Sequence, residues 1–172
     1  MDQAIQNFVR PFISPAKTQV ISELTKLASP KVTVVWVFLI FIFFLYQRKI
    51  RNGIGVIVIF SGGGILLSII KQVIARQRPF ERMVPEGTYS FPSGHTFGSL
   101  LLLFTFFYLI VPYFNKLKPL IQITMTIFFL FIIFSRVYLF VHFPTDILGG
   151  IFYASFWWYL CSYFAAKYRF WQ

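Results

Sequence analysis

Long apolar runs separated by short polar stretches make up most of the chain after residue 30. Five of these runs contain no charged residue; they cover residues 32–46, 53–70, 96–115, 120–135 and 147–166. A helix that crosses a bilayer needs about 20 mostly apolar residues, and basic residues that flank a shorter run can reach the lipid headgroups. The pattern predicts an all-α integral membrane helical bundle with about five transmembrane helices.

The first 30 residues show a different pattern, because they are more polar and interrupted by prolines. Apolar residues recur with helical spacing on one face of each half: Ile5, Phe8, Val9 and Phe12 in the first, and Val20, Ile21, Leu24 and Leu27 in the second. Neither half is long or apolar enough to span a bilayer, so we expect an amphipathic segment lying on the membrane surface. The sequence thus predicts an interfacial lead-in at 1–30 and a membrane-embedded domain at 31–172.

The composition agrees with a membrane protein of one domain. Of the 172 residues, 58% are hydrophobic and only 12% are charged, about half the charged share of an ordinary soluble domain. The formal net charge of +11 comes from basic residues in the loops between apolar runs, which suits lipid headgroups rather than nucleic acid. The single cysteine, Cys161, excludes a disulfide framework or a cysteine-rich metal site.

Basic residues also predict how the bundle is oriented. Five alternating spans bring seven cations and no acid to one side: Arg48, Lys49, Arg51, Lys116, Lys118, Lys167 and Arg169. Loops rich in lysine and arginine face the cytoplasm. We therefore expect a multi-pass plasma-membrane protein whose other side, which carries the polar stretches described next, faces the extracytoplasmic space. The lead-in on that side also carries cations, which weakens the contrast between the sides.

The polar stretch SRVYLFVHFPTD, residues 135–146, lies between the fourth and fifth apolar runs. Ionisable groups at the edge of the hydrocarbon are costly and therefore need a partner or a task. Pro144 suits the first position of a helix, which would bring Asp146 into the first turn, beside His142. A carboxylate bonded to one ring nitrogen leaves the other free as a base or nucleophile, and Arg136 could hold an anion next to it.

Two more polar islands fall on the same predicted side. In the first, Lys71 and Arg78 are seven residues apart, on nearly the same face of a helix that Pro79 would end, and they would form an anion clamp. In the second, Ser93 is a suitable N-cap and Gly94 allows close backbone approach. The free N–H groups of that helix start suit a phosphate, and His95 could give or take a proton.

Fixed cations, a helix N-terminus, two histidines and one carboxylate suit phosphoryl transfer, which needs charge neutralisation, a nucleophile and a proton for the leaving oxygen. We expect this chemistry to need no metal or other cofactor. Few acids are available on this side, Asp146 is best used on His142, and the nearby cations would repel a divalent ion.

The three islands read Lys-x6-Arg-Pro, Pro-Ser-Gly-His and Ser-Arg-x5-His-x3-Asp, in that order. The chain resembles the type 2 phosphatidic acid phosphatase superfamily of membrane lipid phosphatases, which carry these motifs. The resemblance implies that the domain at 31–172 removes a terminal phosphate from a membrane lipid phosphate or prenyl diphosphate. Candidate substrates are phosphatidylglycerophosphate, phosphatidic acid and undecaprenyl diphosphate. The chain departs from the family at the N-terminus, where members often have a sixth span.

The resemblance also implies roles for individual residues. His142 would be the nucleophile that forms a phosphohistidine, Asp146 would orient it, and His95 would protonate the leaving group and later activate water. The phosphoryl oxygens would be bound by Lys71, Arg78, Ser93, Gly94 and Arg136. Other charged residues of this side have no such role in our interpretation: we expect Arg76 and Arg82 to be headgroup or loop charges, and Glu81 and Glu86 to lie in a solvated loop.

Two other functions fit the same residues. A non-catalytic lipid-phosphate binding or transport protein could use the cations only to hold phosphate. A lipid phosphotransferase could pass the phosphoryl group from His142 to an acceptor other than water. No feature of the sequence indicates a protein partner.

Overall fold

The computed structural model describes residues 2–87 and 89–170, and its regular secondary structure is entirely helical. Two short helices, α1 (Asp2–Val9) and α2 (Pro15–Thr25), precede five longer ones. These are α3 (Pro30–Tyr46), α4 (Ile50–Ile74), α5 (Gly94–Thr105), α6 (Lys118–Tyr138) and α7 (Pro144–Lys167). Helix α5 continues through a π-helical turn, Phe106–Ile110, and 3-10 turns occupy Arg10–Phe12, Lys26–Ala28, Val111–Tyr113 and Asn115–Leu117.

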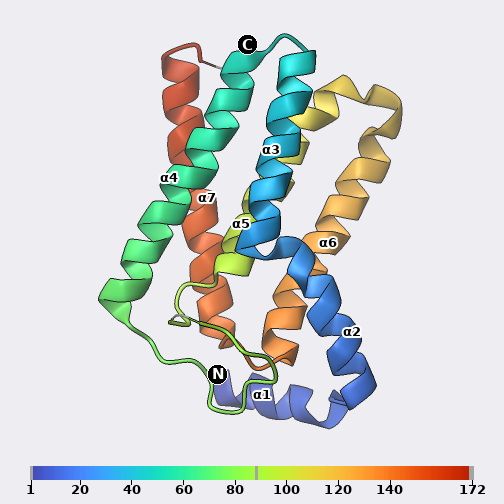
Figure 1. Cartoon of the computed structure of the whole chain (residues 1–172), viewed down its shortest axis with the longest axis vertical. Coiled ribbons are helices and arrows are strands. Elements are labelled where there is room, and N and C mark those ends of the chain that lie inside the picture. The colour runs from blue at the N-terminus through green and yellow to red at the C-terminus, as the bar shows by residue number, and fades with distance from the viewer. Residues whose placement is uncertain (1, 88, 171–172) are drawn as a thin grey trace.

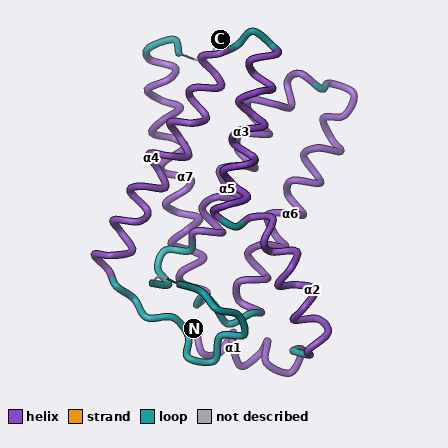
Figure 2. The backbone as a smooth tube through the Cα atoms, viewed as in Figure 1, coloured by secondary structure: helices purple, strands orange, loops and turns teal. Residues whose placement is uncertain are grey.

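The five longer helices run along the long axis of the molecule, and α1 lies across its lower end (Figure 1). The chain between α4 and α5, described at residues 75–87 and 89–93, contains no helix there and lies at that same end beside α1 (Figure 2). The turn between α6 and α7 is also there. The two loops that carry the predicted site residues therefore meet at one end of the bundle, next to the N-terminal helices.

Helix α5 is the centre of the bundle. Its residues from His95 to Leu103 are all buried, and it packs against α3, α4, α6 and α7. Helix α4 approaches α7 closely at Gly63, where a Cβ atom would lie 2.8 Å from Trp157 Nε1. Two side chains of α7 donate hydrogen bonds to backbone carbonyls of α4, Tyr153 to Gly63 at 2.8 Å and Trp157 to Ile59 at 2.8 Å. These contacts give the site a rigid support.

Each of the five predicted apolar helices is present. Their ends lie within five residues of those expected when the π-helical and 3-10 turns that continue α5 to Tyr113 are included. Three helical stretches are long and apolar enough to cross a membrane, namely Ile50–Ile74, Gly94–Tyr113 and Asn115–Tyr138. A fourth passes if Pro15–Ala28 and Pro30–Tyr46, which meet at a 43° bend, count as one broken span. Helix α7 is 24 residues long but is rich in tyrosine and tryptophan, which lower its mean hydropathy. The all-helical membrane bundle is confirmed, and the number of spans stays a prediction.

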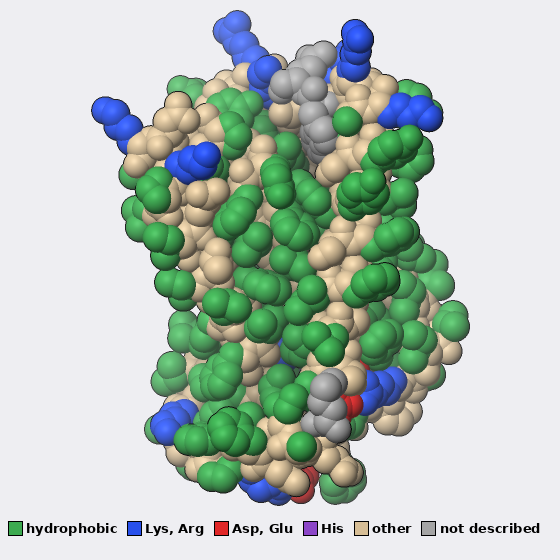
Figure 3. All heavy atoms as spheres, turned by 180° about the vertical axis from the view of Figure 1, so that it is seen from behind, with side chains coloured by type: hydrophobic (Ala, Val, Ile, Leu, Met, Phe, Trp, Pro, Cys, Tyr) green, Lys and Arg blue, Asp and Glu red, His purple; other side chains and the backbone are tan. Residues whose placement is uncertain are grey.

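The surface has the charge distribution of a membrane protein. In Figure 3 lysine and arginine side chains gather at both ends, and hydrophobic side chains cover the middle. Acidic side chains are visible only at the lower end in this view. The uncharged middle band matches a bilayer, whose hydrocarbon core excludes unpaired charges.

Helix α1 turns its polar side toward the protein. Gln6 and Val9 are buried, whereas Phe8 and Phe12 are 71% and 55% exposed. Val9 packs against the buried residues of the α6–α7 turn. The apolar residues predicted to share one helical face are therefore divided between the protein interior and the outer surface. The outward apolar side agrees with an interfacial helix, although the division at residue 30 stays a prediction.

Candidate active site

The α6–α7 turn brings His142 and Asp146 together. Helix α7 begins at Pro144, as the sequence predicts, because proline has a helical φ and needs no hydrogen-bond acceptor. Asp146 is fully buried, and its Oδ2 accepts a hydrogen bond of 2.9 Å from the Phe143 N–H at the helix start. The same oxygen lies 3.4 Å from Nδ1 of His142, longer than a well-formed hydrogen bond. Catalytic contacts of this kind often tighten when substrate binds.

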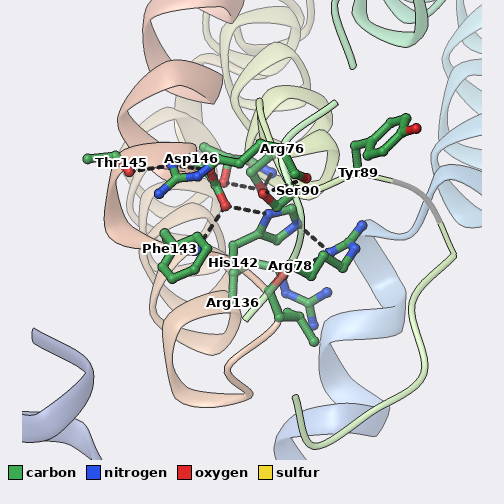
Figure 4. Close-up of polar contacts among 12 residues, drawn as sticks. Arg76, Arg78, Tyr89, Ser90, Arg136, His142, Phe143, Thr145 and Asp146 are labelled. Carbon is green, nitrogen blue, oxygen red and sulfur yellow. Dashed lines mark hydrogen bonds and ion pairs between the residues drawn. The ribbon is translucent and has the colours of Figure 1, made fainter. Parts of the chain in front are cut away.

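The second ring nitrogen of His142, Nε2, faces Arg78. Nη1 of Arg78 is 3.3 Å away and also donates a hydrogen bond of 2.9 Å to the Val141 carbonyl. Figure 4 shows the imidazole between the Asp146 carboxylate and this guanidinium. Burial lowers the pKa of His142 to about 4; the nearby Arg78 and Lys71 charges act in the same direction, and Asp146 opposes them. The imidazole is therefore neutral at physiological pH, with a lone pair available at one nitrogen.

The start of α5 forms the second part of the site. Ser93 is the N-cap, as predicted: its buried Oγ accepts hydrogen bonds from the Thr96 N–H at 3.4 Å and the Thr96 hydroxyl at 3.0 Å. The Ser93 N–H donates to the Asp146 carbonyl at 3.0 Å, which ties α5 to the first turn of α7. A Cβ atom at Gly150 would lie 2.9 Å from the Ser93 carbonyl. The close approach of the two helices therefore requires glycine.

Lys71 and Arg78 lie in the same site but not on one helix. Helix α4 ends at Ile74, because Ala75 adopts a left-handed conformation with φ 48°. The expectation of two cations on one helical face was therefore wrong. Lys71 lies in the last turn of α4 and donates to the Tyr89 carbonyl at 2.6 Å, whereas Arg78 reaches His142 from the following loop. The tertiary fold, rather than helical spacing, brings the two cations together.

Arg136 and His95 meet in the interior, on α6 and α5. Nη1 of Arg136 is 3.4 Å from both ring nitrogens of His95. Arg136 is 1% exposed, and within residues 2–87 and 89–170 its Nε and Nη2 have no hydrogen-bond partner. A buried guanidinium with unused donors is suited to receive the oxygens of an anion.

Glu86 lies in this cluster, and the expectation of a solvated position was wrong. Its Oε1 is 3.0 Å from Nη1 of Arg136, and its Oε2 is 3.9 Å from Nη2 of Arg78. Its side chain is 22% exposed. The carboxylate thus contacts the two guanidiniums that the sequence assigns to phosphate. Glu86 is one of two acids between the first two motifs, with Glu81, and nothing in the sequence separates them.

Arg76 is the second residue that sequence reasoning missed. Its Nη1 donates to Asp146 Oδ1 at 2.7 Å and to the Thr145 hydroxyl at 2.6 Å, and its Nη2 contacts Asp2 at 2.9 Å. In an extended segment, residues two apart point to the same side, so its position two residues before Arg78 was a usable signal. Arg82 is exposed, in agreement with a loop charge.

A cavity of about 510 Å³ joins these groups to an apolar wall. His142, His95, Lys71, Arg78, Glu86 and Gly94 line one part of it. Side chains of α3, α4 and α5 line the rest, among them Val34, Val37, Ile57, Phe60, Leu67 and Phe97. Val34 and Ile57 are 69% and 39% exposed, so the cavity continues to the outer surface between α3 and α4. Gly64 lines this cavity and has no neighbour within 4 Å of a Cβ position.

No group of three or more histidine, cysteine, aspartate or glutamate residues in the described part of the chain could hold a metal ion. The site is instead dominated by cations, with Glu86 and Asp146 each engaged by arginine. Metal-independent chemistry stays a prediction that a chelator can test.

Comparison with known proteins identifies the family. A sequence profile described as the PAP2 superfamily matches residues 52–170, which include the three polar islands. The chain belongs to the PAP2 superfamily. The predicted family resemblance is confirmed, and this PAP2 chain is an integral membrane phosphatase, a hydrolase.

Individual relatives agree with this assignment. The PAP2 chain is 30% identical over 153 residues to phosphatidylglycerophosphatase B of Bacillus subtilis, covering 87% of this chain and 75% of that protein. It is 28% identical over 127 residues to an undecaprenyl-diphosphatase of Sulfolobus acidocaldarius, covering 67% and 56% of the two.

Two crystal structures share the fold. One is a transmembrane PAP2-type phosphatidylglycerolphosphate phosphatase from Bacillus subtilis, with a TM-score of 0.87 and 29% identity over 96% of this chain and 85% of that one. The other is Aquifex aeolicus LpxE, with a TM-score of 0.71 over 96% and 94%; at 19% identity it supports the fold alone.

Proposed function

We propose that this protein removes a terminal phosphate from a lipid phosphate or diphosphate through a phosphohistidine at His142. One observation carries the proposal: two buried histidines and the cations Lys71 and Arg78 line a single cavity whose wall between α3, α4 and α5 is mostly apolar. A phosphate suits the polar part and a lipid chain suits the apolar part. A substrate that carries both a phosphate and an apolar chain accounts for both parts of the cavity.

The first step is attack by Nε2 of His142 on phosphorus. A neutral imidazole with its proton on Nδ1, facing Asp146, has a lone pair at Nε2, and the low pKa of His142 supports that state. The N–P bond forms as the ester P–O bond breaks, and His95 supplies a proton to the leaving oxygen. Arg78, Arg136 and Lys71, with the Gly94 N–H, neutralise the equatorial oxygens. Ser93 fixes the helix start, and its hydroxyl accepts both of its hydrogen bonds from Thr96. It therefore keeps its own proton to donate to a phosphoryl oxygen.

The second step is hydrolysis of the phosphohistidine. His95, now without its proton, takes one from a water that attacks phosphorus. The N–P bond breaks, and inorganic phosphate leaves with His142 restored. Asp146 stabilises the positive charge that the imidazole carries while it is phosphorylated, as a buried carboxylate does for a catalytic histidine.

The cavity wall supports a lipid substrate. The opening between α3 and α4 is lined by exposed apolar residues such as Val34 and Ile57, so an acyl or prenyl chain can remain in the membrane while its headgroup reaches the histidines. Phosphatidylglycerophosphate, phosphatidic acid and undecaprenyl diphosphate are the candidate substrates. The names of the relatives support the first and the last of them.

We place the protein in the plasma membrane with the site on the extracytoplasmic side. The end opposite the site carries seven cations and no acid, and such ends face the cytoplasm. Labelling single cysteines with a membrane-impermeant maleimide in intact cells tests this, on a Cys161→Ser background. A cysteine at residue 82 should react and one at residue 116 should not.

Phosphate release from purified protein tests the reaction. We expect turnover of lipid phosphates or diphosphates in excess chelator, and loss of at least about 10³-fold in His142→Ala, with Lys116→Ala at the other end as control. Activity that requires added magnesium would contradict the metal-free mechanism. If the protein binds the lipid phosphate and His142→Ala leaves its function intact, the protein is a binding or transport protein instead.

Addition of a competing alcohol separates hydrolysis from transfer. A hydrolase yields inorganic phosphate alone, whereas a phosphotransferase yields a new phosphate ester from the same phosphohistidine. A phosphorylated alcohol as the main product would replace hydrolysis by transfer in the proposal.

A further inference from the structure

Arg76 forms a bridge between the N-terminal helix and the buried Asp146. One nitrogen, Nη1, bonds Asp146 Oδ1 at 2.7 Å, and the other, Nη2, bonds Asp2 Oδ2 at 2.9 Å. The guanidinium also lies over the Phe143 ring, 4.3 Å from its centroid. The Arg76 carbonyl accepts a hydrogen bond of 2.8 Å from the Ser90 N–H. Backbone and side chain are therefore both fixed, and the arginine has one available geometry.

The bridge determines which way the Asp146 carboxylate points. Oδ1 is bound by Arg76, so Oδ2 is directed to the Phe143 N–H and to Nδ1 of His142. Asp146 is fully buried, and a buried carboxylate is strongly destabilising unless a cation and hydrogen bonds compensate it. Arg76 is the cation in direct contact with it. Without Arg76 the carboxylate would lose both its orientation and the cation that compensates its charge.

Asp2 completes the network from α1. Its Oδ1 accepts from the Thr145 N–H at 3.0 Å, and its Oδ2 accepts from the Thr145 hydroxyl at 2.7 Å. The Thr145 N–H is one of the first N–H groups of α7, which have no partner within the helix, and the N-cap residue Phe143 has no side-chain acceptor. Burial raises the pKa of Asp2, but bonds from Thr145 and Arg76 outweigh it and hold the pKa below its ordinary value.

Helix α1 is held where Asp2 can do this. Val9 packs in the cluster of Tyr138, Leu139, Phe140 and Val141, directly before His142. The Ser14 N–H donates to the Tyr138 hydroxyl at 3.2 Å. An exposed ion pair of 2.6 Å, Arg10 with Glu81, adds a surface contact. The helix is thus docked on the turn that carries His142.

We propose that Arg76 and Asp2 are positioning residues that hold the Asp146 carboxylate against His142, which makes α1 a part of the active site. This rests on the proposed phosphohistidine chemistry. Neither residue lines the cavity, so both act through Asp146 rather than on substrate. The N-terminal segment then has a catalytic contribution in addition to its contact with the membrane.

Steady-state kinetics of the full-length protein in detergent test this. We expect Arg76→Gln to lower kcat by about 10- to 100-fold, as loss of an outer hydrogen-bond partner does, and Asp2→Asn to lower it by about 3- to 10-fold because one acceptor oxygen remains. KM and inhibition by vanadate should change less than about twofold in both, since the phosphate groups are untouched. Arg76→Lys should recover part of the loss.

The pH dependence of kcat/KM separates positioning from a structural effect. Removal of the cation beside Asp146 leaves its carboxylate less compensated, which raises the pKa of His142, a group whose pKa the charges of Arg78 and Lys71 lower. The acid limb should therefore move toward neutral pH by about one unit in Arg76→Gln. Arg10→Gln is the matched control: it removes an exposed ion pair near α1 that touches neither Asp146 nor Arg76. Because exposed ion pairs contribute little to stability, α1 should stay docked, and kcat and the acid limb should stay unchanged.

The outcomes are distinct for the two levels of the proposal. An active His142→Ala would overturn the proposed function. If His142→Ala is inactive but Arg76→Gln and Asp2→Asn keep the wild-type kcat and acid limb, only the positioning roles are overturned. A loss of kcat in Arg10→Gln as large as that in Arg76→Gln would overturn them too. If Arg76→Gln does not fold, Asp2→Asn decides alone. In an Asp146→Asn background, Asp2→Asn should have no further effect.

Discussion

The two ends of the bundle use the same residue types in different ways. At the end that carries the C-terminus, seven lysines and arginines have no acid near them in the sequence. At the site end, all five acids of the chain are in ion pairs with lysine or arginine: Asp2, Glu23, Glu81, Glu86 and Asp146. Unpaired cations suit headgroups and orientation, whereas buried cations such as Arg78 and Arg136 suit a site that must bind an anion. Charge alone does not separate these uses; burial and pairing do.

The largest expected difference between the two ends is in activity, when one arginine at each end is replaced by glutamine. Arg136→Gln removes a buried guanidinium with unused donors, and we expect kcat/KM to fall by about 10³-fold, the upper range for loss of one charge-stabilising donor. Arg136→Lys should not restore it, because an ammonium cannot form the planar fork. Arg51→Gln, exposed at the other end, should stay within about twofold. Equal losses would remove the contrast between the ends.

An intermediate effect is expected on the free energy of unfolding when the pH is lowered. The pKa of His142 is about 4 in the folded protein and about 6.5 in an unfolded chain. Between these values the unfolded state binds more protons, so stability falls as the pH falls from about 6.5 to 4, by about 3 kcal/mol in total for this group. Thermal unfolding in detergent at pH 7.5 and 4.5 should show a smaller difference in His142→Gln than in the wild type. An identical difference would contradict the buried neutral imidazole.

The smallest effect concerns the two glutamates of the loop at residues 75–93. Glu86 contacts the guanidiniums that we assign to phosphate, so a phosphate must displace its carboxylate. We expect Glu86→Gln to lower KM and the inhibition constant of inorganic phosphate by about 3- to 10-fold, the effect of about 1 kcal/mol, with kcat changed less. Glu81→Gln, which breaks only the exposed pair with Arg10, is the control. A raised KM in Glu86→Gln would mean that Glu86 helps to bind substrate.

Local signals allowed much of the fold and the site to be predicted. Apolar runs gave the five longer helices, because burial in lipid or in a core leaves a continuous pattern in the sequence. Ser93 and Pro144 marked the starts of α5 and α7, because capping depends on only a few neighbouring residues. The motifs predicted eight site residues, and the fold brings these eight residues to one end of the bundle.

What the sequence could not provide depends on tertiary contacts. The segment at residues 75–93 has no periodicity, and its path is fixed by contacts such as Arg76 with Asp146 and Glu86 with Arg136. Asp2 and Thr145 are 143 residues apart in the chain, and no spacing rule connects them. The helical spacing of Lys71 and Arg78 was misleading, because one left-handed residue, Ala75, ended the helix early.

The opening between α3 and α4 has a consequence for how the enzyme meets its substrate. A lipid that slides in sideways does not leave the bilayer, so the cost of about 0.8 kcal/mol for each methylene transferred to water never arises. The encounter is then two-dimensional. The rate of encounter follows the mole fraction of substrate among the surrounding lipids rather than the bulk molarity of the substrate. Dilution with inert lipid therefore slows the encounter even when the total amount of substrate is constant.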